Sequence, residues 1–223
     1  MTPRLRRVRR SPYAVIRLFS QRDGGAILED SRGPAADGPA CPKGLVVNRT
    51  PVVLIHGAWL HKSSWESWAE RFASSGFAVH VPGWPGEAAS AAEGRRDPDP
   101  SRDLGLENLV AHYEVFVRSL DIPPVLIGHS LGGLMVQHLF SLGLGRAAVA
   151  LAPMPADGAW QDPPRNGFRS LGLTGSGDHR GFVPLPRSQF RHTFANTVGE
   201  DEAARLFRLQ QVVFQLSAFP GIG

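Results

Sequence analysis

The sequence of 223 residues lacks the features that mark several classes of protein. It has a single cysteine, Cys41, so it can form no internal disulfide, and no Cys/His cluster predicts a zinc or other metal site. This cysteine usage is typical of a cytoplasmic protein, which we expect here. The longest apolar run near the N-terminus, Tyr13 to Phe19, is broken by Arg17 and is too short for a signal peptide or a membrane span. We therefore expect no membrane association.

Acidic residues are absent from the first 22 positions, which hold seven arginines. The formal net charge of +4 is therefore local: the chain has 24 Lys and Arg against 20 Asp and Glu, so the residues after position 22 carry a net charge of −3. The basic face that is typical of a nucleic-acid-binding domain is missing. We expect no nucleic-acid partner, and the alternative, binding through the Arg-rich tail, would show as salt-dependent affinity.

The chain divides into three parts by composition. Residues 20–44 contain eight glycines and prolines, a density that interrupts helices and strands, and we expect residues 1–44 to be a disordered extension. Residues 45–152 hold the apolar runs and the segments of helical period, and we expect them to form an α/β core. From Pro153 onward the pattern changes to proline pairs, glycines and arginines, and we interpret residues 153–223 as a cap or lid segment.

Strand-length apolar runs alternate with segments of helical period in the central part. This alternation predicts a three-layer α/β fold, in which a mostly parallel sheet is joined by crossover helices. Residues 82–103 are expected to form a long loop. The predicted strands are 51–55, 77–81, 124–127 and 147–152, and the predicted helices are 63–75, 106–120, the segment after residue 131, and about 200–218.

One short motif carries the chemistry. The sequence GHSLG at residues 128–132 has the pattern G-x-S-x-G, and it stands between a predicted strand and a predicted helix. This is the setting in which a tight turn presents a serine nucleophile, here Ser130. The backbone N–H of Leu131 is then one donor for the oxyanion that develops on the substrate, and Ala58, in the HGAW run after strand 51–55, is placed to supply the second.

The runs VVLIHGAW, PGWPGE and VLIGHSLGG occur in that order, and in them the sequence resembles the α/β-hydrolase superfamily, particularly its esterase, lipase and cofactor-free haloperoxidase-like branch. The resemblance covers residues 45–152, and residues 153–223 look like the helical cap of many members. It implies a serine hydrolase without a cofactor, which cleaves a small, mostly apolar ester through an acyl-enzyme on Ser130. It also implies that Ala58 and Leu131 are the oxyanion donors.

The acid and the histidine of the family's triad follow the serine along the chain. Only 93 residues follow Ser130, and within them Asp178 and His192 are the candidates. His192 follows Asp178 by only 14 positions, which is too few for a helix and a strand in between. We therefore expect the acid and the histidine to lie beyond Gly223, and we keep Asp178 with His192 as the alternative.

Two other functions stay open on the same residues. The Trp-rich HGAW run is also similar to the plant esterase and hydroxynitrile lyase branch, so a lyase or a perhydrolase would use the same pocket for a different reaction. A binding protein or an inactive fragment is favoured if no acid and histidine come within reach of Ser130.

Overall fold

The main sheet has six strands in the order β1-β2-β6-β5-β3-β4. The computed structural model describes residues 49–97, 104–154 and 185–210, and it describes the backbone of four short strand segments, 6–7, 16–20, 182–183 and 214–215. The sheet contains β1 (Arg6–Arg7), β2 (Ile16–Ser20), β3 (Pro51–Ile55), β4 (Ala78–His80), β5 (Val125–His129) and β6 (Ala147–Leu151). The four strands β4, β3, β5 and β6 pair in parallel, as predicted.

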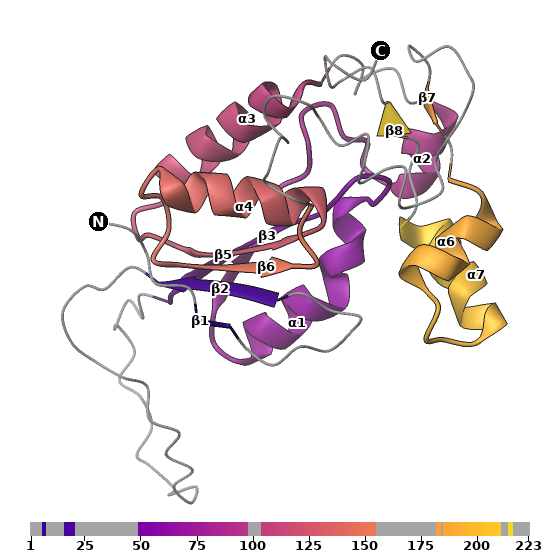
Figure 1. Ribbon diagram of the computed structural model, residues 1–223, viewed down its shortest axis with the longest axis horizontal. Helices are drawn as coiled ribbons and strands as arrows, with labels where there is room; N and C mark the ends of the chain where they lie inside the picture. The colour runs from indigo at the N-terminus through magenta and orange to yellow at the C-terminus, as the bar shows by residue number, and fades with distance from the viewer. Residues whose placement is uncertain are drawn as a thin grey trace, which may run out of the picture.

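Helices cover both faces of this sheet and make the three layers that the sequence predicts (Figure 1). On one face lie α3 (Leu106–Arg118) and α4 (Leu131–Ser141), and on the other lie the 3₁₀ helix η1 (Lys62–Trp65) and α1 (Glu66–Ser74). The side chains of β3 divide between two hydrophobic clusters, with Val53 and Ile55 in one and Val52 and Leu54 in the other. Burial on both faces explains why this strand is apolar throughout.

The N-terminal part differs from the expectation of a disordered extension over residues 1–44. Strand β2 pairs antiparallel with β6, with Ile16 opposite Leu151 and Ser20 opposite Ala147, and β1 pairs with β2. These strands extend the sheet beyond β6, so part of the segment belongs to the folded body. Residues 1–5, 8–15 and 21–48 lie outside the described residues.

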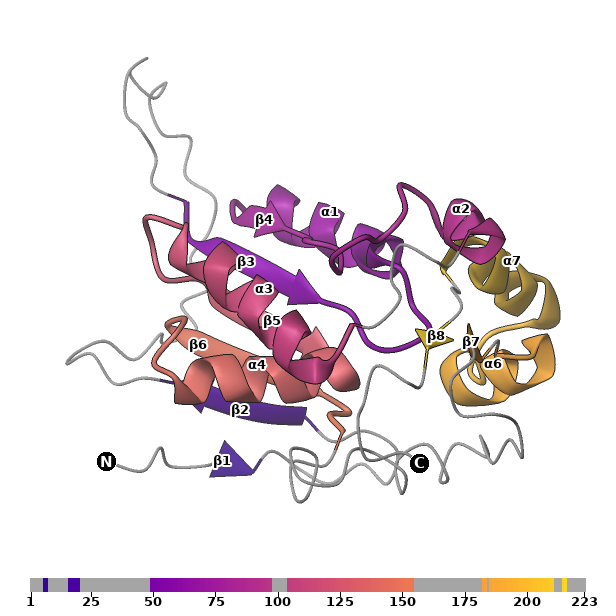
Figure 2. The same cartoon turned by 90° about the horizontal axis from the view of Figure 1, so that it is seen from above.

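Among its described residues, the C-terminal part contains two helices past the end of the sheet, beside α2 (Ala91–Arg96; Figure 2). They are α6 (Arg187–Phe194), which the sequence did not predict, and α7 (Glu200–Gln210). The helix predicted over residues 200–218 is wrong after residue 210, because residues 214–215 form strand β8, which pairs antiparallel with β7 (Phe182–Val183). Asp178 lies outside the described residues. No helix in the described part of the chain is long and apolar enough to cross a bilayer.

Backbone carbonyls of α7 tie this helix pair to the core. The His61 N–H donates to the carbonyl of Gln210 at 2.8 Å, and the Ser63 hydroxyl donates to that of Leu209 at 3.0 Å. The predicted loop 82–103 also contains a helix, α2 (Ala91–Arg96), which begins with a capping box between Ser90 and Glu93. Arg95 on α2 donates to the carbonyl of Arg208 at 2.8 Å.

Candidate active site

Ser130 occupies the turn between β5 and α4, with φ 52° and ψ −115°. Residues other than glycine rarely adopt this backbone conformation, and its strain costs about 1–3 kcal/mol. Its N–H donates to the carbonyl of Leu151 at 3.0 Å, and its carbonyl accepts from the N–H groups of Leu134 and Met154 at 3.1 Å each. The first turn of α4 and the end of β6 thus hold Ser130 in place through the backbone alone.

Glycines allow the segments around Ser130 to approach more closely than side chains would permit. A Cβ on Gly57 would lie 2.9 Å from the Cβ of Ser130 and equally close to the carbonyl oxygen of His129. A Cβ on Gly132 would overlap the carbonyl oxygen of Ile55, and one on Gly128 would overlap the backbone of Gly132. The serine turn therefore packs backbone to backbone against the segment that leaves β3.

Backbone strain is concentrated past the carboxyl ends of three neighbouring parallel strands. Within the described residues, Trp59, Ser130 and Ala152 are the non-glycine residues with positive φ, at 60°, 52° and 40°. They follow β3, β5 and β6, which are neighbours in the sheet. Strained conformations of this kind gather at functional sites because the surrounding structure must hold them there.

The two backbone amides that the sequence singled out lie on the segments that meet at Gly57. Leu131 is the first residue of α4, so its N–H has no acceptor within the helix. A Cβ on Gly57 would be 3.5 Å from the nitrogen of Leu131. Ala58 follows Gly57 directly, and both Ala58 and Leu131 are buried. Their role as oxyanion donors stays a prediction.

An acid and a histidine for Ser130 are not brought together in the described ranges 49–97, 104–154 and 185–210, where no such group is hydrogen-bonded to its hydroxyl. His192 lies exposed on α6, and its carbonyl accepts a hydrogen bond from Asn196 at 3.2 Å. The pairing of Asp178 with His192 stays a prediction. The same ranges contain no group of three or more metal-ligating side chains that could hold an ion.

A cavity of about 340 Å³ lies between the α6–α7 pair and the core, and its lining includes His129, the residue before Ser130. Its lining is mostly apolar and aromatic, with no Lys, Arg, Asp or Glu: His56, Leu60, Ser64, Trp65, Trp68, His129, Leu151, Phe190, Thr193, Phe194, Leu206 and Gln210. Burial, and secondarily the charge of His56, lowers the pKa of His129 from 6.5 to about 4. His129 is therefore neutral at pH 7 and too weakly basic for an efficient general base.

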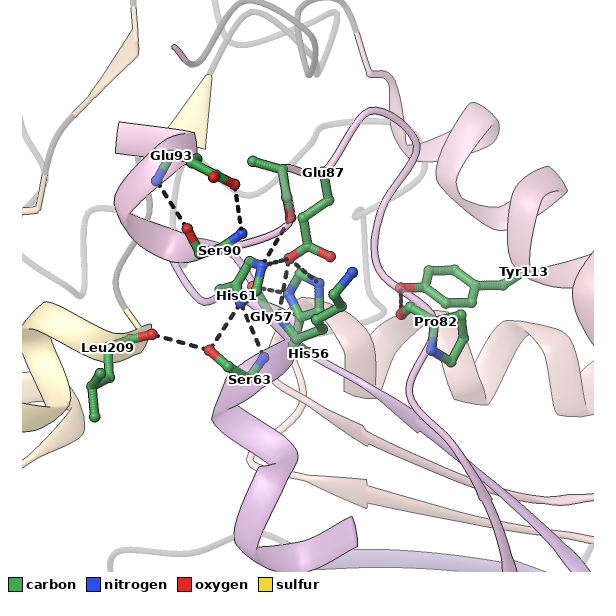
Figure 3. A network of polar contacts seen from close by, with 12 residues as sticks. His56, Gly57, His61, Ser63, Pro82, Glu87, Ser90, Glu93, Tyr113 and Leu209 are labelled. Carbon is green, nitrogen blue, oxygen red and sulfur yellow. Dashed lines mark hydrogen bonds and ion pairs between the residues drawn. The ribbon is translucent and has the colours of Figure 1, made fainter. Parts of the chain in front are cut away.

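A carboxylate that sequence reasoning missed lies beside the loop that follows β3 (Figure 3). The side chain of Glu87 is only 9% exposed, and its Oε1 lies 3.4 Å from Nε2 of His56 and 3.7 Å from Nε2 of His61. The same oxygen accepts the N–H of Lys62 at 2.9 Å. Burial raises the pKa of Glu87, but the hydrogen bond and charge of His56, the N–H of Lys62 and the charge of His61 outweigh it and lower the pKa below 4.5.

Both histidines that face Glu87, His56 and His61, are buried. The ring of His56 stacks on Trp84 with centroids 5.0 Å apart, and His61 is 2% exposed. The run PGWPGE marks the segment of Glu87 as unusual. Nothing in the local sequence pattern, however, indicates that Glu87 contacts Lys62 and His56, which lie 25 and 31 positions earlier in the chain.

Comparisons with known proteins agree with this architecture. A model of the alpha/beta hydrolase family matches residues 52–222. Pimeloyl-[acyl-carrier protein] methyl ester esterase of Chromobacterium violaceum is 39% identical over 87 residues, which are 39% of this chain and 30% of that protein. The chain thus matches less than a third of the length of this curated relative.

Solved structures support the fold. An extracellular alpha/beta-hydrolase from a Paenibacillus species aligns with a TM-score of 0.53 and 21% identity, over 75% of this chain and 69% of that one. A methylesterase from Arabidopsis aligns with a TM-score of 0.50 and 15% identity, over 77% of this chain and 71% of that one. At these identities the likeness concerns the fold alone.

Proposed function

This chain belongs to the alpha/beta hydrolase family, and on that premise we propose that it is a serine esterase with Ser130 as the nucleophile. The Ser130 oxygen would attack the carbonyl carbon of an ester and expel the alcohol. The resulting acyl-enzyme would then be hydrolysed by water, which releases the free acid and restores the serine.

The observation that carries this proposal is the conformation of Ser130. A non-glycine residue with φ 52° between a parallel strand and a helix, packed against Gly57, is the geometry of a serine presented at the end of the sheet. Amides of Leu131 and Ala58 would stabilise the negative charge that develops on the carbonyl oxygen. Loss of one such donor typically lowers kcat by about 10²–10³.

The substrate class follows from the cavity and one relative. A mostly apolar lining without Lys, Arg, Asp or Glu favours an uncharged, mostly apolar group in the bound ester. The Chromobacterium relative is named for a methyl ester, which supports a small alcohol as the leaving group. In this proposal α6 and α7 cap the bound ester, and the enzyme acts in the cytoplasm without a metal or organic cofactor.

A fluorophosphonate probe tests the nucleophile directly, because it reacts covalently with an activated serine near amide donors. Mass spectrometry of the labelled chain should find the adduct on Ser130, and Ser130→Ala should abolish it. Ser141→Ala, which removes an exposed hydroxyl from the same helix, should leave labelling unchanged. An adduct elsewhere with Ser130 unmodified, or no adduct, contradicts the proposal.

The reaction type requires a second measurement. With 4-nitrophenyl acetate as substrate, hydrolysis releases 4-nitrophenol and acetate in equal amounts, and both should disappear in Ser130→Ala. Release of 4-nitrophenol that depends on added hydrogen peroxide would instead favour a perhydrolase. A labelled serine without ester turnover would favour the binding-protein alternative.

A further inference from the structure

We propose that Glu87 is a positioning residue, whose buried carboxylate fixes the loop of residues 56–62 and so holds the Ala58 N–H where an oxyanion needs it. The inference rests on the proposed function, because it takes Ala58 as an oxyanion donor. Glu87 touches neither Ser130 nor the cavity, and it would act only through the loop.

The contacts of Glu87 span the loop from its first residue to its last. His56 is the residue directly after β3, and Lys62 is the first residue of η1. A single oxygen, Oε1, faces His56 at 3.4 Å and accepts the Lys62 N–H at 2.9 Å. Ala58 and the strained Trp59 lie between these two contacts. One carboxylate thus joins both ends of the segment that contains the proposed donor.

The ring of His56 lies between two acceptors. Its Nδ1 lies 3.1 Å from the carbonyl oxygen of Gly57, and its Nε2 faces Oε1 of Glu87. Both neighbours are acceptors, so each of them can orient the ring.

The ring of His61 is held by contacts of both its nitrogens. Its Nδ1 accepts the N–H of Ser63 at 3.1 Å, and its Nε2 faces the carbonyl of Ala88 at 3.1 Å and Glu87 at 3.7 Å. Glu87 and Ala88 therefore bind the ring that caps η1.

The segment that carries Glu87 is itself fixed to α3. The Tyr113 hydroxyl donates to the carbonyl of Pro82, and Nε2 of His112 lies 3.1 Å from the carbonyl oxygen of Gly83 (Figure 3 shows the first contact). The N–H of Glu87 donates to the carbonyl of Trp84 at 2.9 Å. Glu87 can therefore serve as a rigid support and does not simply follow the loop.

The other oxygen of Glu87 argues against a purely stabilising role. Oε2 is buried and has no hydrogen-bond partner, which is unfavourable for folding. A Cβ on Gly83 would overlap this oxygen, so glycine at position 83 leaves the space that the carboxylate occupies. A buried polar atom without a partner calls for an explanation, and a functional role of Glu87 supplies one.

Glu87→Ala and Glu87→Gln test the inference, with Glu93→Gln as the matched control because Glu93 is an exposed carboxylate of the neighbouring capping box. Hydrogen exchange of peptides covering residues 56–62 should accelerate about tenfold or more in Glu87→Ala, and that of residues 128–136 should not. In Glu87→Gln, whose amide oxygen can still accept the Lys62 N–H, the acceleration should be smaller.

Kinetics with 4-nitrophenyl acetate provide the second readout. In Glu87→Ala, kcat should fall about 10–100-fold with KM changed less than twofold, since a displaced donor loses stabilisation of the transition state and not of the bound ester. Glu87→Gln should be intermediate and Glu93→Gln unchanged.

The two proposals fail in different ways. If the unaltered chain neither reacts with the fluorophosphonate probe nor hydrolyses the ester, the proposed function fails and the role of Ala58 fails with it. If the unaltered chain is active but both Glu87 variants keep its kcat and its exchange in residues 56–62, only the inference about Glu87 is overturned. Should Glu87→Ala not fold, Glu87→Gln alone decides through the same two measurements.

Discussion

The serine turn and the loop of residues 56–62 touch at Gly57, but different interactions hold them in place. Backbone hydrogen bonds fix the turn. Its glycines let the backbone segments pack so closely that an added Cβ would not fit between them. In the loop, buried side chains add to the backbone hydrogen bonds, among them Glu87 beside His56 and His61. The turn should therefore not tolerate an added Cβ, whereas the loop, on the proposal above, depends on the carboxylate of Glu87.

This comparison predicts its largest effect at Gly132. A Cβ in Gly132→Ala would overlap the carbonyl oxygen of Ile55, and backbone that is packed on both sides cannot move away easily. We expect the free energy of unfolding to fall by about 3 kcal/mol or more. Gly199→Ala is the control, because a Cβ there meets nothing within 4 Å, and denaturant unfolding should separate the two. Similar stability in both variants would contradict backbone packing as the basis of the turn.

Low pH should lower the free energy of unfolding through His129, the last residue of the strand that precedes the serine turn. Its pKa is lowered to about 4 in the folded chain by burial and by His56, whereas an unfolded chain binds the proton at about 6.5. The associated stability is present above pH 6.5 and is lost as the pH falls to about 4, by at most about 3 kcal/mol. His129→Gln should remove this loss from a series of unfolding curves between pH 7 and 4. His192→Gln, on the exposed face of α6, should keep it.

A glycine at position 130 should separate stability from chemistry in the turn. Ser130→Gly relieves the strain of φ 52° and should raise the free energy of unfolding by about 1–3 kcal/mol while it abolishes labelling by the fluorophosphonate. Ser130→Ala also abolishes labelling but keeps a Cβ, so it should not gain this stability. Equal melting temperatures of the two variants would refute strain at Ser130.

The smallest effect is expected far from both regions. Arg205 makes two 2.7 Å hydrogen bonds to Glu202 on α7, but both side chains are exposed. Water and salt screen such pairs, so Glu202→Gln should change neither the melting temperature nor the rate of labelling measurably. A clear loss of either would mean that α7 supports the site through its surface charges.

The parallel part of the fold was predictable because its signals are local. A strand buried on both faces must be apolar throughout, and β3 was predicted with the bounds that the structure has, Pro51–Ile55. Glycines around Ser130 likewise mark close backbone packing in the sequence itself. The amino-acid sequence is therefore sufficient to propose the hydroxyl, its turn and the two amides.

Pairings across long sequence distances were not predictable in the same way. Strand β2 follows an Arg-rich segment, and its partner β6 is remote in sequence, so composition alone suggested a disordered extension over residues 1–44. Glu87 stands in a Pro- and Gly-rich run that resembles an ordinary loop, and only the fold brings it to His56. Side-chain clusters of this kind leave no periodic trace in a sequence.

The antiparallel pairing of β2 with β6 has a consequence for how the chain folds. Ile16 and Leu151 are opposite each other although 135 positions separate them, so this contact closes a very long loop and is slow to form. During synthesis β2 emerges early but has no partner until β6 has been made. Once β6 has been made, its edge stays open until β2 docks, and another copy of the chain could add a strand there, so aggregation competes with folding during this interval.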